Sequence, residues 1–139
     1  MRKLIALALC LFTVFALVAC AQPAATTDTA APAAGDASQT YAIITKSAGN
    51  PYNEREAAGF EEAITAAGYT AIVKHPAEIT AEAQITLINE LVAQGVSGIA
   101  VAANDKDALE TALKAAMAAG IKVVSLDSSV NPASRLTHI

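Results

Sequence analysis

Polar side chains follow three apolar runs of the sequence, at the points where each run ends. They are Lys46, Ser47, Asn50 and Tyr52 after the first run, Asn104 and Asp105 after the third, and Asp127 and Ser128 after the fourth. Carboxylates accept hydrogen bonds from hydroxyl groups, lysine and amide groups donate them, and an aromatic ring packs on apolar C–H faces. This set of side chains therefore suits an uncharged polyol better than a phosphate, which the two aspartates would repel.

Several of these residues also have a plainer interpretation as part of the fold. Asn50 and Asp105 stand where helices are expected to begin, and either side chain could serve only as a helix cap. Tyr52 could be an ordinary surface aromatic. We favour ligand binding for Lys46, because a charge directly after a buried strand needs a partner. We favour it also for Asp127, which follows the segment VVSL and begins no helix that needs a cap.

Other classes of site lack their signatures in the sequence. Neither G-x-x-x-x-G-K-[ST] nor G-x-G-x-x-G occurs, so the glycine loops that hold nucleotide phosphates are missing. No nucleophile is paired with a base, so we predict neither an enzyme nor a cofactor. His75 and His138 have no ligand-like neighbours in the sequence, so both are interpreted as structural and no metal site is predicted.

The first twenty residues, MRKLIALALCLFTVFALVAC, follow the order of a bacterial export signal. Two basic residues precede an apolar core that is short for a stable membrane span. The final LVAC resembles the lipobox of bacterial lipoproteins, which implies cleavage before Cys20 and lipidation of its thiol. We therefore expect residues 1–19 to be a signal peptide. The rest of the chain would be lipid-anchored on the extracytoplasmic face of a membrane, in the periplasm or at the cell surface.

The segment after the lipobox differs in composition from the rest of the chain. Residues 21–40 lack any large aliphatic or aromatic side chain, so with Cys20 they are expected to form a flexible Ala/Thr/Pro tether. Residues 41–139 are long enough for one domain, without a disulfide because Cys10 is removed. After cleavage, seven basic side chains face thirteen acidic ones, a net charge of −6. That balance argues against a nucleic-acid partner.

The domain alternates short apolar runs with helical patterns. Strands are predicted at 41–45, 69–73, 98–102 and 121–126, and helices at 51–67, about 81–94 and about 106–119. Such βαβ units build a parallel, doubly wound sheet with right-handed crossovers, here in the order 2-1-3-4 with room for a fifth strand. In that order the ends of strands one, three and four are neighbours. The polar residues that follow them should therefore converge, while Lys74 and His75 lie outside.

Residues 41–139 resemble the sugar-type, ribose-binding-like periplasmic binding proteins of ABC transporters. The resemblance rests on KSAGNPY after the first strand, on GVSGIAVAANDKDALETALKAAMAAGIKVVSLDS, and on the closing RLTHI. The segments ANDKDAL and SLDSSVNPASR look most like the rhamnose-binding and autoinducer-2-binding branch. In that branch the first-strand lysine and the fourth-strand aspartate contact the ligand, which implies the same role for Lys46 and Asp127.

Two positions depart from the ribose-binding pattern. The family typically has two adjacent aromatics after Asn-Pro, whereas Asn53 occupies the second position here. It also tends to have arginine after the aspartate, whereas Ser128 stands here. Both departures weigh against ribose itself.

The resemblance implies two lobes that close on a sugar, which an ABC transporter permease then receives. This chain supplies the first lobe, with Arg135–Ile139 as its next strand, and we interpret it as incomplete at its C-terminus. Alone, it should bind sugar weakly or not at all. The alternative is a lipoprotein sensor that presents its ligand to a membrane kinase or chemoreceptor, since its lobe would look the same.

Overall fold

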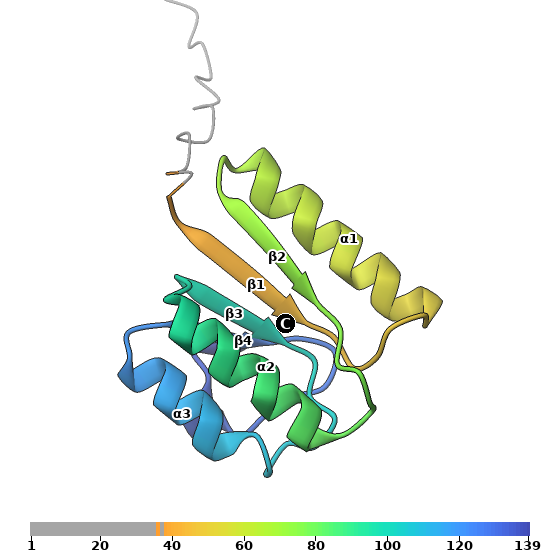
Figure 1. The fold of residues 1–139 in the computed structure, drawn as a ribbon, viewed down its shortest axis with the longest axis vertical. Helices are drawn as coiled ribbons and strands as arrows, with labels where there is room; N and C mark the ends of the chain where they lie inside the picture. The colour runs from red at the N-terminus through yellow and green to blue at the C-terminus, as the bar shows by residue number, and fades with distance from the viewer. Residues whose placement is uncertain (1–35, 37) are drawn as a thin grey trace, which may run out of the picture. The chain divides into compact units, whose positions relative to one another are not determined.

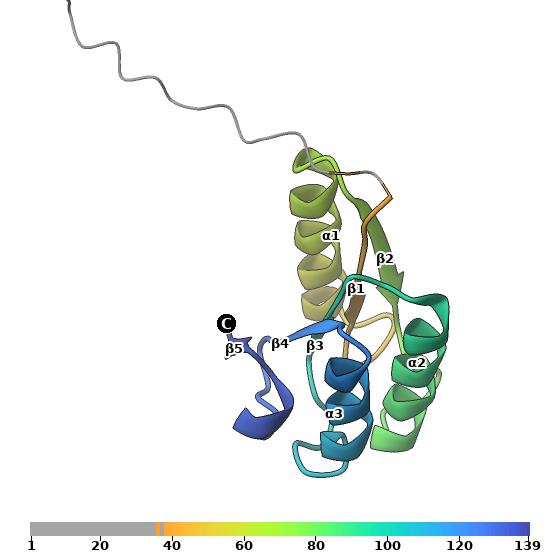
Figure 2. The same cartoon turned by 90° about the vertical axis from the view of Figure 1, so that its left-hand side faces the viewer.

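The computed structural model describes Asp36 and residues 38–139, which form a five-stranded parallel sheet in the order β2-β1-β3-β4-β5 (Figures 1 and 2). The strands are β1 (Thr40–Ile44), β2 (Thr70–Lys74), β3 (Gly98–Val101), β4 (Lys122–Ser125) and β5 (Thr137–His138). The helices are α1 (Pro51–Ala66), α2 (Ala81–Gln94) and α3 (Glu110–Ala118), with a short 3-10 turn at Pro132–Ser134. The predicted class and strand order are confirmed, and each predicted strand is found to within two residues at either end.

The helices begin and end where local sequence signals place them. Asn50 caps α1 by accepting a hydrogen bond from the amide of Tyr52, and Pro51 occupies the first helical position. Thr80 caps α2 by accepting from the amide of Ala83. Gly95 ends α2 in the left-handed conformation, at φ 69°, which glycine adopts without steric cost.

Two apolar layers hold the helices against the sheet. The larger lies under α2 and α3, where Ile88, Leu91 and Leu113 pack on strand residues such as Ile99 and Val101. The smaller lies under α1 on the opposite face, as Figure 2 shows. Because both faces of the central strands are covered, β1 and β3 are almost fully buried and read as continuous apolar runs.

Two details of the helices differ from the prediction. Helix α3 begins at Glu110 rather than near residue 106, because residues 106–109 form turns that the Asp105 carboxylate organises. The buried stripe of α2 runs through Ala81, Gln84, Ile88 and Leu91, and Ile85 only flanks it. A polar glutamine on that stripe was not expected, and its contacts explain its burial, as described below.

The predicted signal peptide, Cys20, and residues 21–35 and 37 of the predicted tether lie outside the described residues. Among the residues that the structure does describe, no helix is long and apolar enough to cross a membrane. The same part of the chain contains no cluster of three or more His, Cys, Asp or Glu side chains that could hold a metal ion.

Candidate functional site

An open pocket lies at the carboxyl ends of β1 and β4, beside the start of α1. It has a volume of about 450 Å³ and is lined by Lys46, Ser47, Asn50, Tyr52, Asn53, Ile79 and Asp127. Five of these seven residues are among those predicted from the sequence. A second pocket lies between α1 and the sheet, but its lining is almost wholly apolar and it lacks the groups that could orient a polar ligand.

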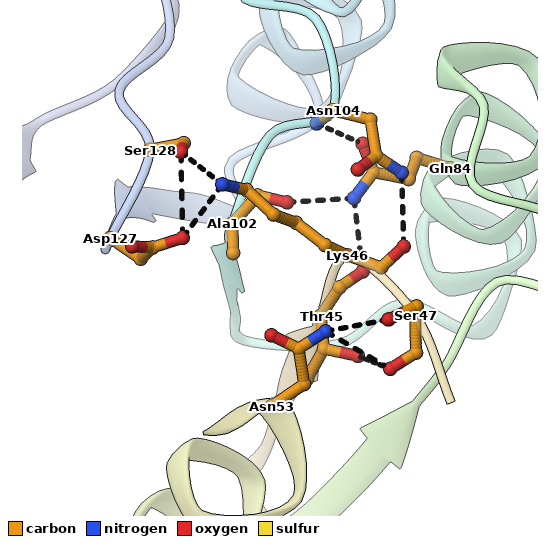
Figure 3. Close-up of polar contacts among 9 residues, drawn as sticks. All are labelled: Thr45, Lys46, Ser47, Asn53, Gln84, Ala102, Asn104, Asp127 and Ser128. Atoms are coloured by element: carbon orange, nitrogen blue, oxygen red, sulfur yellow. Dashed lines mark hydrogen bonds and ion pairs between the residues drawn. The ribbon is translucent and has the colours of Figure 1, made fainter. Parts of the chain in front are cut away.

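Lys46 connects the ends of two strands that are far apart in the sequence. Its ammonium lies 2.8 Å from a carboxylate oxygen of Asp127 and also donates a hydrogen bond to the hydroxyl of Ser128 (Figure 3). The side chains of Lys46 and Asp127 are 32% and 27% exposed, so the pair faces the pocket without being sealed off from water. A ligand hydroxyl could therefore reach both a donor and an acceptor at this point.

Asp127 adopts a backbone conformation that few residue types tolerate. Its φ is +55°, in the left-handed region where aspartate and asparagine are enriched. The hydrogen bond from Lys46 lowers the pKa of the Asp127 carboxyl, despite partial desolvation that acts in the opposite direction. Asp127 is therefore held as a carboxylate, ready to accept hydrogen bonds.

The negative charge of Asp127 raises the pKa of two residues of α1, Tyr52 and Glu56. Tyr52 is 59% exposed at the mouth of the pocket, and the nearby Asp127 carboxylate raises its pKa. Glu56 lies one helical turn further along α1. Burial raises the pKa of Glu56, Asp127 raises it further, and one of its carboxylate oxygens is buried without a hydrogen-bond partner. Sequence reasoning did not single out Glu56, whose only signal is its position four residues after Tyr52.

The floor of the pocket is formed by the buried pair Ser47 and Asn53, of which only Ser47 was predicted from the sequence. Asn53 is 3% exposed, and its amide nitrogen donates to the hydroxyl of Ser47 at 2.8 Å and to the carbonyl oxygen of Ser47 at 3.2 Å. Both side chains line the pocket, but their hydrogen-bonding groups are already engaged with each other. Asn53 thus supports the loop after β1.

The two polar residues after β3 have different roles: Asn104 contacts the proposed site, and Asp105 holds the following turn. The amide nitrogen of Asn104 donates to the carbonyl oxygen of Lys46 at 3.1 Å, so Asn104 joins the end of β3 to the end of β1. The Asp105 carboxylate instead accepts from the backbone amides of Asp107 and Ala108 and does not line the pocket. These two backbone amides lower the pKa of Asp105. Asp105 therefore organises the turn after β3; it does not cap α3, whose N-cap residue is Leu109 and which has no side-chain cap.

The two histidines each hydrogen-bond a hydroxyl at a strand end. Nδ1 of His75 lies 2.7 Å from the hydroxyl of Thr45, and Nδ1 of His138 lies 2.9 Å from the hydroxyl of Ser125. Neither histidine lines the polar pocket. Both observations agree with the structural interpretation of these side chains.

Comparison with known proteins identifies the relatives of this chain. Residues 41–139 match the family model of the periplasmic binding protein domain. A solute-binding protein of an ABC transporter from Clostridium phytofermentas, solved with bound L-rhamnose, is 51% identical over 77% of this chain, with a TM-score of 0.73. A sugar ABC transporter protein from Actinomyces odontolyticus is 33% identical over 76% of this chain, with a TM-score of 0.70.

A third solved relative binds a different kind of ligand. LsrB from Clostridium saccharobutylicum, in complex with AI-2, is 31% identical over 71% of this chain, with a TM-score of 0.64. The matches cover 33%, 35% and 30% of these three solved proteins respectively, so this chain spans about a third of the length of each. The resemblance seen in the sequence is therefore confirmed, including its rhamnose- and autoinducer-2-binding members.

Proposed function

We propose a sugar-capturing role for this chain, which belongs to the periplasmic binding protein domain family. In this proposal, it is part of an extracytoplasmic lipoprotein that takes up a rhamnose-like or autoinducer-2-like sugar and delivers it to the permease of an ABC importer. Periplasmic binding proteins of ABC transporters work outside the cytoplasm and are not enzymes. The sugar, the lipid anchor and the permease are the parts that remain to be tested for this chain.

The observation that carries the proposal is the Lys46–Asp127 pair at the pocket. The pair offers an ammonium donor and a carboxylate acceptor 2.8 Å apart, and Ser128 and Tyr52 lie beside it. A sugar hydroxyl both donates and accepts, so it can bond to both members of the pair at once. A partly exposed aromatic ring beside them suits the C–H face of the same sugar. Ser47, Asn50 and Asn104 complete the proposed ligand-binding set, and Asp105 is its weakest member.

A thermal-shift screen tests the proposal on the full-length protein, by which we mean this chain together with the second lobe that the resemblance implies. L-rhamnose, D-ribose, other pentoses and hexoses, and autoinducer-2 would each be added at several concentrations. A ligand that binds only the folded protein raises the melting temperature, by an amount that grows with its concentration. We expect a shift with one of these sugars that is lost in Asp127→Ala and in Lys46→Ala. Asp107→Ala, which changes an exposed carboxylate away from the pocket, is the control.

Each outcome of the screen has a definite meaning. A shift that disappears in both pocket variants and survives in Asp107→Ala supports sugar capture and names the ligand. A shift that survives in both pocket variants would move the ligand away from this pocket. The absence of any shift would reject a sugar ligand and favour another small solute or a role as a partner-presenting sensor.

The proposed lipid anchor needs a separate experiment. Cells grown with a radioactive or clickable fatty acid should label the wild-type protein, and Cys20→Ser should abolish the label. Cys10→Ser is a matched control, because Cys10 lies within the proposed signal peptide and is removed with it. Labelling that persists in Cys20→Ser would contradict the anchor and leave the sugar site untouched.

A further inference from the structure

A buried glutamine joins the ends of the two strands that bracket the proposed site. Gln84 of α2 is fully buried, and its amide nitrogen donates to the carbonyl oxygen of Thr45 at 3.0 Å and to that of Ala102 at 2.7 Å. Its carbonyl oxygen accepts from the backbone amide of Asn104 at 2.8 Å. Both polar ends of the side chain are thus engaged with backbone groups of β1 and β3 or the residues after them (Figure 3).

The amide stands where the hydrogen-bond ladder of the sheet ends. The last bond between these strands runs from the amide of Ala102 to the carbonyl oxygen of Ile44, at 2.9 Å. Beyond it the strands diverge, and the carbonyl groups of Thr45 and Ala102 receive their hydrogen bonds from Gln84. A buried carbonyl without a partner would be unfavourable. Gln84 therefore takes the place of the next rung of the ladder.

This position is also the point where the strand order reverses. Along the sheet β1 lies between β2 and β3, so the crossover through α1 goes to one side and the crossover through α2 to the other. In open parallel sheets, the crevice at such a switch point is where ligands bind. Gln84 joins the two strand ends at that switch point, although it does not itself line the pocket.

Two residues of the proposed binding set depend directly on this amide. Lys46 follows Thr45, whose carbonyl group Gln84 holds, and the backbone amide of Asn104 is held by the other end of the same side chain. Asn104 in turn donates to the carbonyl oxygen of Lys46. Gln84, Thr45, Lys46 and Asn104 thus form one connected set of hydrogen bonds. A displacement of either strand end would change where the Lys46 ammonium meets Asp127.

We propose that Gln84 is a positioning residue for the sugar site: it sets ligand affinity by fixing Lys46 and Asn104, although it does not line the pocket. The inference rests on the proposed function. The competing explanation is that Gln84 only stabilises the fold. The two explanations differ well below the melting temperature, where essentially all molecules are folded. There a purely stabilising residue would leave the dissociation constant unchanged, whereas a positioning residue would raise it when replaced.

The first test is calorimetric titration of the full-length protein with L-rhamnose and, separately, with D-arabinose. Gln84→Met keeps the approximate length and volume of the side chain but leaves two carbonyl groups and one amide without partners. We expect the dissociation constant of Gln84→Met to rise about three- to thirtyfold, the range for residues that act on a ligand through others. Gln94→Met, at the exposed end of the same helix, is the matched control and should leave the dissociation constant unchanged.

A second variant tests whether ligand affinity depends on pH in a way that a purely structural role of Gln84 would not produce. In Gln84→Glu the introduced carboxyl group can donate to a strand carbonyl only when it is protonated. The groups that hydrogen-bond Gln84 come from the ends of β1 and β3 and are backbone carbonyls and an amide, none of which titrates. The nearby charged or titratable groups are His75, whose Nδ1 lies 2.7 Å from the Thr45 hydroxyl, and Lys46, Asp127, Tyr52 and Glu56, and all of them are the same in the wild type. We therefore expect the affinity of Gln84→Glu, divided by that of the wild type, to increase as the pH falls from 8 to 5.

A measurement on the unmodified protein keeps the inference testable if both variants fold poorly. The side-chain amide protons of Gln84 should exchange with solvent much more slowly than those of Gln94, with or without sugar. Ordinary exchange at Gln84 would overturn the inference, and so would wild-type affinity in Gln84→Met or a ratio for Gln84→Glu that is independent of pH. If the wild-type protein binds neither sugar, the titrations are repeated with the ligand that the thermal-shift screen identifies; the proposed function fails only if that screen finds none, and slow exchange at Gln84 still shows that the amide holds the strand ends.

Discussion

Asp127 combines a strained backbone position with a charge that has one close partner. Its left-handed φ of +55° suits asparagine as well as aspartate, so Asp127→Asn removes the charge and keeps the turn. The pKa of Asp127 is lowered mainly by the hydrogen bond from Lys46. An acid with a lowered pKa stabilises the fold above its unfolded-state value, about 3.9, and this contribution is lost as the pH falls through the lower folded-state pKa.

The first prediction follows from this linkage. At pH 7, Asp127→Asn should lower the free energy of unfolding by at most about 1 kcal/mol, because the pair is partly exposed and screened by solvent. The difference from the wild type should shrink as the pH falls below about 4, because Asp127 then becomes protonated first in the unfolded chain and, at lower pH, in the folded chain. Urea unfolding at pH 7 and pH 3 measures both values. A difference that is the same at both pH values would contradict the ion pair, and Asp107→Asn serves as the exposed control.

Glu56 shows the opposite behaviour, because its carboxyl is partly buried and lacks a partner for one oxygen. Burial raises its pKa, so the charged form is less stable in the folded chain than in the unfolded one. This cost is absent below the unfolded-state pKa of about 4.3 and is fully present above the raised folded-state pKa. The positive charge of Lys46 acts on Glu56, but Lys46 is already paired with Asp127.

The second prediction is that Glu56→Gln stabilises the chain at pH 7, by up to about 1 kcal/mol after allowance for partial exposure. The gain should fade as the pH approaches 4, because the wild-type carboxyl then becomes neutral. Thermal unfolding as a function of pH measures this dependence. Glu61→Gln, on the exposed side of the same helix, should change stability little at either pH. A loss of stability at pH 7 in Glu56→Gln would refute the assignment of Glu56 as an unpaired buried acid.

Residue types and their order were enough to predict five of the seven residues that line the pocket, but the role of each residue depends on geometry. Lys46 could be chosen because a charge after a buried strand needs a partner, and Asp127 because it begins no helix that needs a cap; each is the partner of the other. Gln84 and Asn53 were missed as part of the site, since neither follows a strand. The available signal was a polar residue on the buried stripe of a helix, which is unfavourable unless its amide is hydrogen-bonded.

At the scale of elements, the approach of β1 and β4 to β3 depends on a residue without a side chain. A Cβ added to Gly98 of β3 would lie 2.8 Å from the ring of Tyr41 and 3.2 Å from the carbonyl oxygen of Lys122. The Tyr41 ring is itself held by an edge-on contact with Tyr69, whose ring centre lies 5.2 Å away. Neither neighbour can move away easily, because the Tyr41 ring is held by Tyr69 and the Lys122 oxygen is part of the backbone.

The third prediction compares two glycine substitutions. Gly98→Ala should lower the free energy of unfolding by about 1–3 kcal/mol, the usual cost of overpacking a core. Gly59→Ala, in the middle of α1 with open space around its Cβ position, should raise it by about 0.5–1 kcal/mol through the better helix propensity of alanine. Chemical denaturation of both variants checks the pair. Equal effects of the two substitutions would show that the contact at Gly98 relaxes without cost.

The order of elements was predictable because each carries its own periodic signal, whereas boundaries depend on hydrogen bonds that periodicity does not report. The apolar runs and glycine stops located every strand from β1 to β4 and the ends of α1 and α2. The start of α3 was predicted too early, because residues 106–109 continue the helical pattern in sequence but form turns around the Asp105 carboxylate. A capping residue type in the sequence predicts that a turn begins, but it does not predict whether the turn continues directly as an α-helix.

At the scale of the molecule, the strand order expected for a doubly wound sheet is the one observed, and that order places the polar strand ends together. The pocket they form is shallow on its open side. Tyr52 and Ile79, which line it, are 59% and 71% exposed. Small-molecule sites usually bury most of the surface of their ligand. The described residues therefore offer one wall of the proposed sugar site rather than an enclosure.

The fourth prediction is that residues 21–139 alone bind L-rhamnose at least about a hundredfold more weakly than the full-length protein, because roughly half of the ligand contacts would be lost. This expectation agrees with the span of the chain, about a third of the length of the solved relatives. Calorimetric titration of both proteins measures the ratio. Circular dichroism first has to show that residues 21–139 are folded, so that weak binding is not mistaken for unfolding. Micromolar binding by the folded shorter chain would mean that the Lys46–Asp127 wall recognises the sugar without a facing surface.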